Sequence, residues 1–114
     1  MREEEFAAIL ERGHEIRGIE FKGPGLRSDK NMMAKVTLAV LGLSNLRDGG
    51  RVIIGVEETD DGPDPIGLDE DQIRSWNAYD EIATAINEYA SPSVNFDLER
   101  LDFQGNQFVI LRVY

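Results

Sequence analysis

The feature that most constrains the fold is a long apolar helix followed almost at once by a fully apolar strand. Ser28 or Asp29 can cap a helix that runs to about Leu46, and this segment is apolar nearly all round. After the turn "NLRDGG", residues 52–56 read "VIIGV", the continuous run typical of a strand buried on both faces. We therefore expect a central buried helix beside a central strand. Gly55 within that strand predicts close approach by another backbone or by a ligand.

Shorter elements surround this centre. Periodicity and turn residues predict a helix over residues 3–12, a strand over 18–22, a polar loop over 59–65, helices over 68–76 and 79–90, and a hairpin of 94–101 with 107–113. The helix over 79–90 carries Ile82, Ala83, Ile86 and Tyr89 on one stripe. The order predicts one compact α+β (mixed α/β) domain over residues 1–114, with a mixed β-sheet flanked by helices. Because the last predicted strand reaches the final residues, we expect an N-terminal fragment of a longer protein.

Charge is distributed unevenly along the chain. The net charge is -10, yet residues 12–51 carry +4, against -3 for residues 1–11 and -11 for residues 52–114. A basic block of this kind can contact phosphate while the acidic flank keeps the protein in solution. The chain has no cysteine and no apolar run of the roughly 20 residues that span a bilayer. We expect a cytoplasmic protein without a membrane partner.

Two glutamates close to Gly18 are candidate metal ligands. Glu15 and Glu20 are five residues apart, a spacing that would not align them on one continuous helix or strand, but a bend at Gly18 would let them converge. Glu57 or Glu58, just after the buried strand, could supply a third carboxylate. Mg²⁺ and Mn²⁺ prefer such oxygen ligands. Because the chain has 22 acidic residues, spacing alone favours ordinary solvated carboxylates over a metal site.

The segments "EIRGIEFK", "LSNLRDGGRVIIGVEE" and "PIGL", in this order around the apolar helix, resemble a known family. They are similar to the AlbA-like domain of the Schlafen family, which is also found in many bacterial proteins. The resemblance spans about Gly13 to Leu68 and continues loosely to the final hairpin. Each motif is weak alone, and their shared order and spacing make the match specific.

This resemblance implies a site and a reaction. In the Schlafen ribonucleases, three carboxylates hold a divalent cation and the enzyme cleaves structured RNA such as tRNA. The matching positions here are Glu15, Glu20 and Glu58, with Mg²⁺ or Mn²⁺ as the expected cofactor, and Lys22 matches the motif lysine. The third position is Glu where Asp is common, so Glu57 is a second candidate there. Those ribonucleases combine two copies of the domain, which implies a homodimer for this chain.

The resulting hypothesis is a metal-dependent endoribonuclease that prefers RNA to DNA, with Glu15, Glu20, Glu58 and Lys22 as its catalytic residues. Expected contacts to the nucleic-acid backbone come from the basic block, namely Arg17, Lys22, Arg27, Lys30, Arg47 and Arg51. One alternative is a non-catalytic nucleic-acid-binding or regulatory module of a larger transcriptional or defence protein. Another is a nucleotide-sensing or oligomerisation domain whose Gly49-Gly50 turn meets a phosphate. That turn precedes a strand and lacks the GxxxxGK[ST] pattern, which favours a tight helix-to-strand connection.

Overall fold

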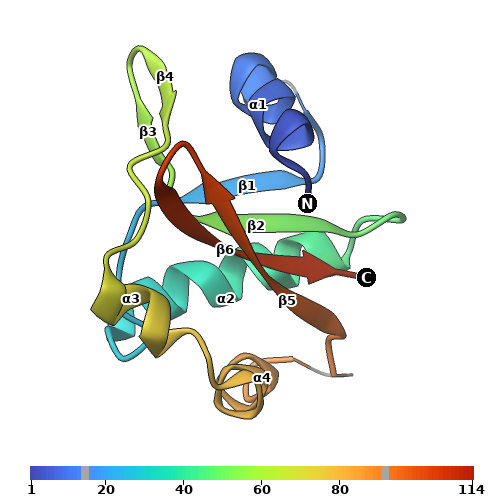
Figure 1. Cartoon of the computed structure of the whole chain (residues 1–114). Coiled ribbons are helices and arrows are strands. Elements are labelled where there is room, and N and C mark those ends of the chain that lie inside the picture. Colours follow the sequence, from blue (N-terminus) through green and yellow to red (C-terminus); the bar gives the residue numbers. More distant parts are fainter. Residues whose placement is uncertain (14–15, 91–92) are drawn as a thin grey trace.

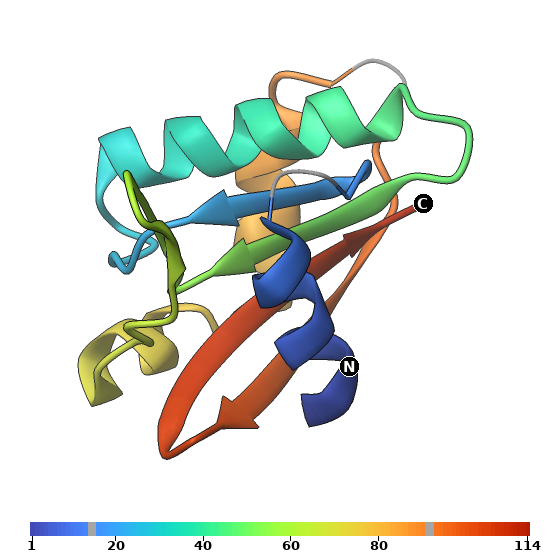
Figure 2. The same cartoon turned by 90° about the horizontal axis from the view of Figure 1, so that it is seen from above.

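A four-stranded mixed sheet forms the centre of the computed structural model, which describes residues 1–13, 16–90 and 93–114. The strand order across the sheet is β1 (Ile19–Lys22), β2 (Gly50–Ile54), β6 (Asn106–Val113) and β5 (Phe96–Phe103). Strands β1 and β2 are parallel, and the other neighbours are antiparallel. Helices α1 (Glu3–Arg12) and α2 (Lys30–Ser44) lie on opposite faces of this sheet (Figures 1 and 2). The predicted α+β fold with a mixed sheet is confirmed.

Helix α2 connects the two parallel strands, and its start is set by a side-chain cap. The Asp29 carboxylate accepts hydrogen bonds from the backbone N–H groups of Asn31 and Met32, at 2.9 and 3.1 Å. Such a cap satisfies donors that the first helical turn leaves without partners. Because α2 returns the chain to the start of the parallel strand β2, its C-terminal end lies beside the first residues of both strands.

The sheet separates two apolar clusters. On one face, α2 packs its buried side chains against Val52 and Ile54 of β2 and against alternate residues of β6. On the other face, Phe6 and Ile9 of α1 pack against Phe21, Ile53 and further residues of the sheet. Strand β2 therefore contributes to both clusters, as its unbroken apolar run predicted. Phe21 is buried, and Ile19 is partly buried.

The segment predicted as a polar loop is instead a small hairpin. Strands β3 (Glu57–Thr59) and β4 (Gly62–Asp64) form a separate two-stranded sheet, which projects beside α1 in Figure 1. The Thr59 hydroxyl donates to the Gly62 carbonyl at 2.8 Å and accepts from the Asp61 N–H at 3.2 Å, which closes the turn. Every residue of β3 is exposed, so no apolar alternation marked this strand in the sequence.

The remaining helices cover the α2 side of the molecule. Helix α3 (Glu70–Ser75) begins with a capping box between Asp69 and Gln72, and helix α4 (Tyr79–Asn87) packs against α2. Two sequence expectations are wrong here. Helix α2 is not buried all round, because Leu38 is 70% exposed, and Tyr89 is 73% exposed because α4 ends before it. None of the helices in the described ranges is long and apolar enough to cross a membrane.

Candidate functional site

The end of β1 brings Glu20 and Glu58 to one hollow. The Lys22 carbonyl accepts hydrogen bonds from the N–H groups of Gly55 and Val56, at 2.8 and 3.0 Å, so β3 begins beside the end of β1. Glu20 and Glu58 both line a hollow of about 430 Å³, together with Arg17 and the C-terminal part of α2. Both glutamates are exposed to solvent. Two carboxylates separated by 38 positions in the sequence therefore share one cavity wall.

Glu57 is placed differently from its neighbour. Its Oε1 atom lies 2.8 Å from the point that a Cβ atom would occupy at Gly23, so the Glu57 side chain lies against that glycine. Glu57 is not among the residues that line the hollow. Successive side chains of a strand point to opposite sides, which explains why only Glu58 faces Glu20.

The third predicted carboxylate, Glu15, lies outside the described residues. Within residues 1–13, 16–90 and 93–114, no group of three His, Cys, Asp or Glu residues is arranged to hold a metal ion. Even without Glu15, Glu20 and Glu58 offer exposed carboxylates, and carboxylate oxygens are ligands that Mg²⁺ prefers. Mg²⁺ often takes only one or two carboxylates from the protein, with water and phosphate completing its coordination shell. The donor chemistry at this hollow therefore fits a hard divalent cation.

The lysine and arginines of the predicted basic block do not form one patch. Lys22 follows Glu20 on the same face of β1, and Arg47 lies exposed in the turn after α2. Arg27 and exposed Lys30 lie near the N-terminal end of α2, far along the helix from that turn. The Arg27 guanidinium donates to the Glu81 carboxylate at 2.7 Å and to the Ser75 carbonyl at 3.2 Å. Arg27 is therefore already held by partners within the protein.

Arginines from three segments meet in a second hollow beside the first. This hollow of about 340 Å³, which we call the arginine hollow, is lined by Arg17, Arg51 and Arg112 together with the acids Glu5 and Asp48. Residues 16–19 line both cavities, so the two hollows meet at the start of β1. Arg112 and Glu5 were not predicted from the sequence. The signal for Arg112 was a charged side chain directly after the apolar run 108–111 of β6.

Close backbone packing fixes the turn at the arginine hollow. A Cβ atom at Gly49 would lie 2.0 Å from the Val113 carbonyl oxygen, and one at Gly50 would lie 2.3 Å from the Gly18 carbonyl oxygen. The Gly49 N–H donates to the Leu46 carbonyl at 3.1 Å, so this donor is engaged within the chain. The two glycines therefore serve a tight helix-to-strand connection, as the sequence favoured.

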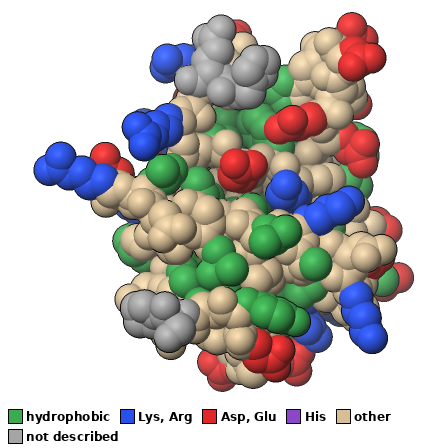
Figure 3. Space-filling view, turned by 180° about the vertical axis from the view of Figure 1, so that it is seen from behind, with side chains coloured by type: hydrophobic (Ala, Val, Ile, Leu, Met, Phe, Trp, Pro, Cys, Tyr) green, Lys and Arg blue, Asp and Glu red, His purple; other side chains and the backbone are tan. Residues whose placement is uncertain are grey.

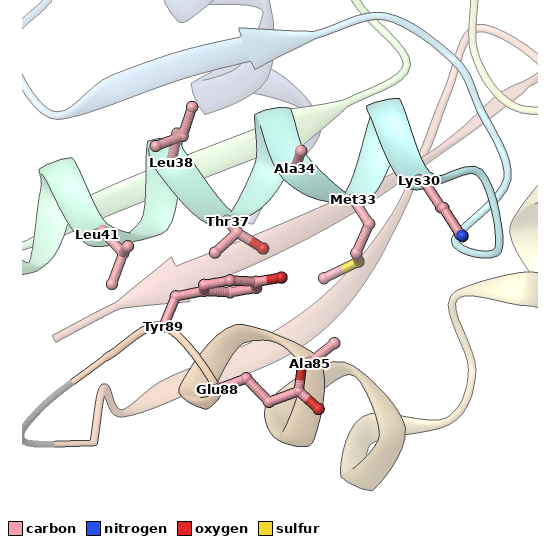
Figure 4. A pocket seen from close by; sticks show the side chains of 9 residues that line it. All are labelled: Lys30, Met33, Ala34, Thr37, Leu38, Leu41, Ala85, Glu88 and Tyr89. Atoms are coloured by element: carbon pink, nitrogen blue, oxygen red, sulfur yellow. The ribbon is translucent and has the colours of Figure 1, made fainter.

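A larger hollow is apolar and lies elsewhere. A groove of about 660 Å³ runs between α2 and the α4 end, and most of its lining is hydrophobic, including Met33, Leu38, Leu41 and Tyr89 (Figure 4). Lys30 stands at one end of this groove, and Glu88 projects from the α4 side. Figure 3 shows the same side of the molecule, with hydrophobic side chains gathered below a zone where acidic and basic side chains lie close together. No site residue predicted from the sequence lies in the groove, except Lys30.

Comparison with known proteins identifies the family. The sequence model of the family described as Schlafen, AlbA_2 matches residues 15–114. The chain belongs to this family. The expectation drawn from the sequence motifs is therefore confirmed. Membership indicates a function related to nucleic acid.

Solved structures share the fold of this chain. The DIP2311 protein from Corynebacterium diphtheriae has a TM-score of 0.60 at 18% identity, over 96% of this chain and 24% of that protein. The N-terminal domain of a protein related to the ATP-dependent DNA helicase RecG, from Nitrosomonas europaea, has a TM-score of 0.58 at 21% identity, over 99% and 73% of the two chains. The chain thus spans about a quarter of DIP2311. No curated protein matches the sequence.

Proposed function

We propose that this Schlafen AlbA_2 domain is a metal-dependent endoribonuclease that acts on structured RNA such as tRNA. The observation that supports this proposal is the shared hollow of Glu20 and Glu58, which come from different strands and meet only in the folded chain. Family membership supports a nucleic-acid substrate. The preference for RNA over DNA rests on the Schlafen ribonucleases that the sequence resembles.

The residues of the hollow have separate roles in this proposal. Glu20 and Glu58, together with Glu15, would hold Mg²⁺ or Mn²⁺. Such an ion, when bound, lowers the pKa of a coordinated water and neutralises charge on a phosphate. Lys22, on the same face of β1 as Glu20, would stabilise negative charge that develops on the phosphate under attack. Arg17, which lines the same hollow, would hold the RNA backbone in place.

Cleavage of labelled tRNA in the presence of Mn²⁺ or Mg²⁺ tests the proposal. We expect Glu20→Gln and Glu58→Gln each to lower the cleavage rate at least about a hundredfold, because metal catalysis supplies several kcal/mol. Glu57→Gln is the matched control, since that side chain lies against Gly23 and not in the hollow. A second readout is metal binding itself. Mn²⁺ should raise the Tm of the wild-type protein and of Glu57→Gln, but not that of Glu20→Gln or Glu58→Gln.

Other results would contradict the nuclease. If the glutamine variants at Glu20 and Glu58 cut as fast as the wild type, the activity does not come from this hollow. If the protein binds RNA equally with and without metal and never cuts it, the domain is a non-catalytic nucleic-acid-binding module. If a DNA hairpin is bound more tightly and cut faster than tRNA, the preference for RNA is overturned.

The nuclease proposal includes a homodimer, and the apolar groove is the face that suits a second copy. Helix α2 contains Lys30 and Lys35 and no acidic residue, whereas α4 and the following Glu88 contain only acidic charges. A two-fold axis at the groove would place the basic helix of each copy against the acidic helix of the other, around the exposed side chains of Leu38 and Tyr89.

Light scattering coupled to size-exclusion chromatography tests the dimer. We expect a dimer for the wild type and a monomer for Leu38→Lys, which puts a charge into the apolar lining of the groove. Ile66→Lys is the control, because Ile66 is also exposed, at 48%, but lies outside the groove. A wild-type protein that is monomeric at all concentrations, or a dimer that both variants disrupt equally, would exclude this face.

A further inference from the structure

Two arginines stand directly opposite each other in the sheet. Arg51 of β2 and Arg112 of β6 are paired in the antiparallel register, and Asp97 of β5 follows in the same row. Paired residues of neighbouring strands project from the same face, here the face covered by α1. Like charges in directly opposite positions destabilise a sheet. An anion placed between or beside the two guanidinium groups would reduce this repulsion.

Neighbouring side chains contact both arginines. The Arg51 guanidinium donates to the Glu5 carboxylate of α1 at 2.8 Å. The Arg112 guanidinium lies 5.3 Å from the centre of the Tyr114 ring, and the Tyr114 hydroxyl donates to Asp97. Glu5 beside Arg51 and Asp97 opposite Arg112 thus place negative charge next to the facing arginines. The hydrogen bond from Arg51 also holds the pKa of the Glu5 carboxyl below its ordinary value.

Arg17 adds a third guanidinium to the arginine hollow and links it to the carboxylates. It is exposed, and it lines both the arginine hollow and the hollow of Glu20 and Glu58. Guanidinium groups donate paired hydrogen bonds that match the oxygens of a phosphate. Glu20 pairs with Val52 and so lies on the α2 face of the sheet, whereas the paired arginines lie on the α1 face. A nucleic-acid strand with its reacting phosphate at Glu20 and Glu58 would reach these arginines by passing over the start of the edge strand β1, where Arg17 lies.

We propose that the arginine hollow binds a backbone phosphate next to the scissile one, and that Glu5 occupies Arg51 until the nucleic acid displaces it. The proposal rests on the proposed function for the identity of the ligand as a nucleic acid. It adds a phosphate subsite that includes Arg112, and it makes α1 an internal competitor for that subsite. Removing the Glu5 charge should therefore strengthen binding, whereas a purely structural ion pair predicts no such gain.

Fluorescence anisotropy with labelled tRNA in EDTA tests the subsite without cleavage. We expect Arg17→Gln and Arg112→Gln each to weaken binding roughly threefold to tenfold. Each should also lower, by about one, the slope of the logarithm of the binding constant against the logarithm of the salt concentration. Arg100→Gln is the matched control, because Arg100 is exposed on β5 and lines neither hollow. Glu5→Gln should strengthen binding roughly threefold. Glu4→Gln removes a charge from the same helical turn but no contact to Arg51, and it should change binding much less.

Several results would overturn the subsite. It fails if Arg17→Gln and Arg112→Gln behave like Arg100→Gln, or if Glu5→Gln and Glu4→Gln have equal effects. Thermal melts of each variant check that the fold is retained. The two proposals fail separately. RNA that is bound with the expected effects but never cut with metal refutes the nuclease and keeps the subsite. RNA that is cut while all the arginine variants bind equally refutes the subsite and keeps the nuclease.

Discussion

The charged end of the sheet, which comprises the arginine hollow and the hollow of Glu20 and Glu58, differs in construction from the apolar groove between α2 and α4. At the charged end, the side chains are positioned by backbone contacts that leave no room for a Cβ atom at Gly49 or Gly50. In the groove, exposed side chains such as Leu38 lie on the outer surface of a helix whose other face holds the core. The charged end therefore depends on exact backbone geometry, whereas the groove can change without loss of the fold.

The largest expected effect on stability comes from a substitution that disturbs the backbone turn at the charged end. Gly49→Ala would place a methyl group 2.0 Å from the Val113 carbonyl oxygen at a residue with φ of 64°. We expect it to lower the free energy of unfolding by about 3 kcal/mol or more, measured by urea denaturation. Gly42→Ala is the matched control. No atom lies within 4 Å of its added methyl group, so it should raise the stability by up to about 1 kcal/mol. Equal effects of the two changes would contradict this account.

The next effect separates the two faces of α2. Leu43 is only 4% exposed and belongs to the core, whereas Leu38 is 70% exposed in the groove. Leu43→Ala should lower the free energy of unfolding by about 3 kcal/mol, because it leaves a cavity. Leu38→Ala should change it by less than about 0.5 kcal/mol in a monomer. Urea denaturation at low protein concentration checks both values. A large loss for Leu38→Ala under these conditions would mean that the groove supports the fold of a single chain.

Much of the fold was predictable because its signals are local. The apolar run at Val52–Val56, the cap at Asp29 and the turn at Gly105 each determine a conformation within a few residues. The β3–β4 hairpin was missed because its exposed, polar strands lack any hydrophobic alternation, and side-chain bonds from Thr59 close its turn. Exposure of Leu38 could not be predicted either, because α2 is apolar nearly all round and its sequence does not mark which side faces the sheet.

The candidate site was predictable only in part. Glu20 and Glu58 were proposed together from the family resemblance, and the fold brings both to one hollow. The opposition of Arg51 and Arg112 depends on the register of β2 with β6, which joins residues 61 positions apart. No local pattern encodes such a register. The pairing of Arg27 with Glu81 is equally long-range, and no local pattern predicts it.

The smallest expected effect is a pH dependence that only the charged end should show. The pKa of Glu5 is lowered in the folded state, chiefly by the hydrogen bond from Arg51. The pair therefore stabilises the fold above the ordinary glutamate pKa of about 4.3, and this contribution is lost as the pH falls below it. Because both side chains are partly exposed, we expect less than about 1 kcal/mol.

Urea denaturation between pH 7 and pH 3 measures this contribution as the difference between wild type and Glu5→Gln. The difference should be largest at neutral pH and should shrink as the pH falls toward 3, because protonated Glu5 resembles glutamine in charge. Glu4→Gln should show a smaller dependence, since Arg51 contacts Glu5 and not Glu4. Leu38→Ala, in the groove, should differ from wild type by the same small amount at every pH. A difference for Glu5→Gln that does not change with pH would show that Glu5 acts by packing, and the charged end would then resemble the groove.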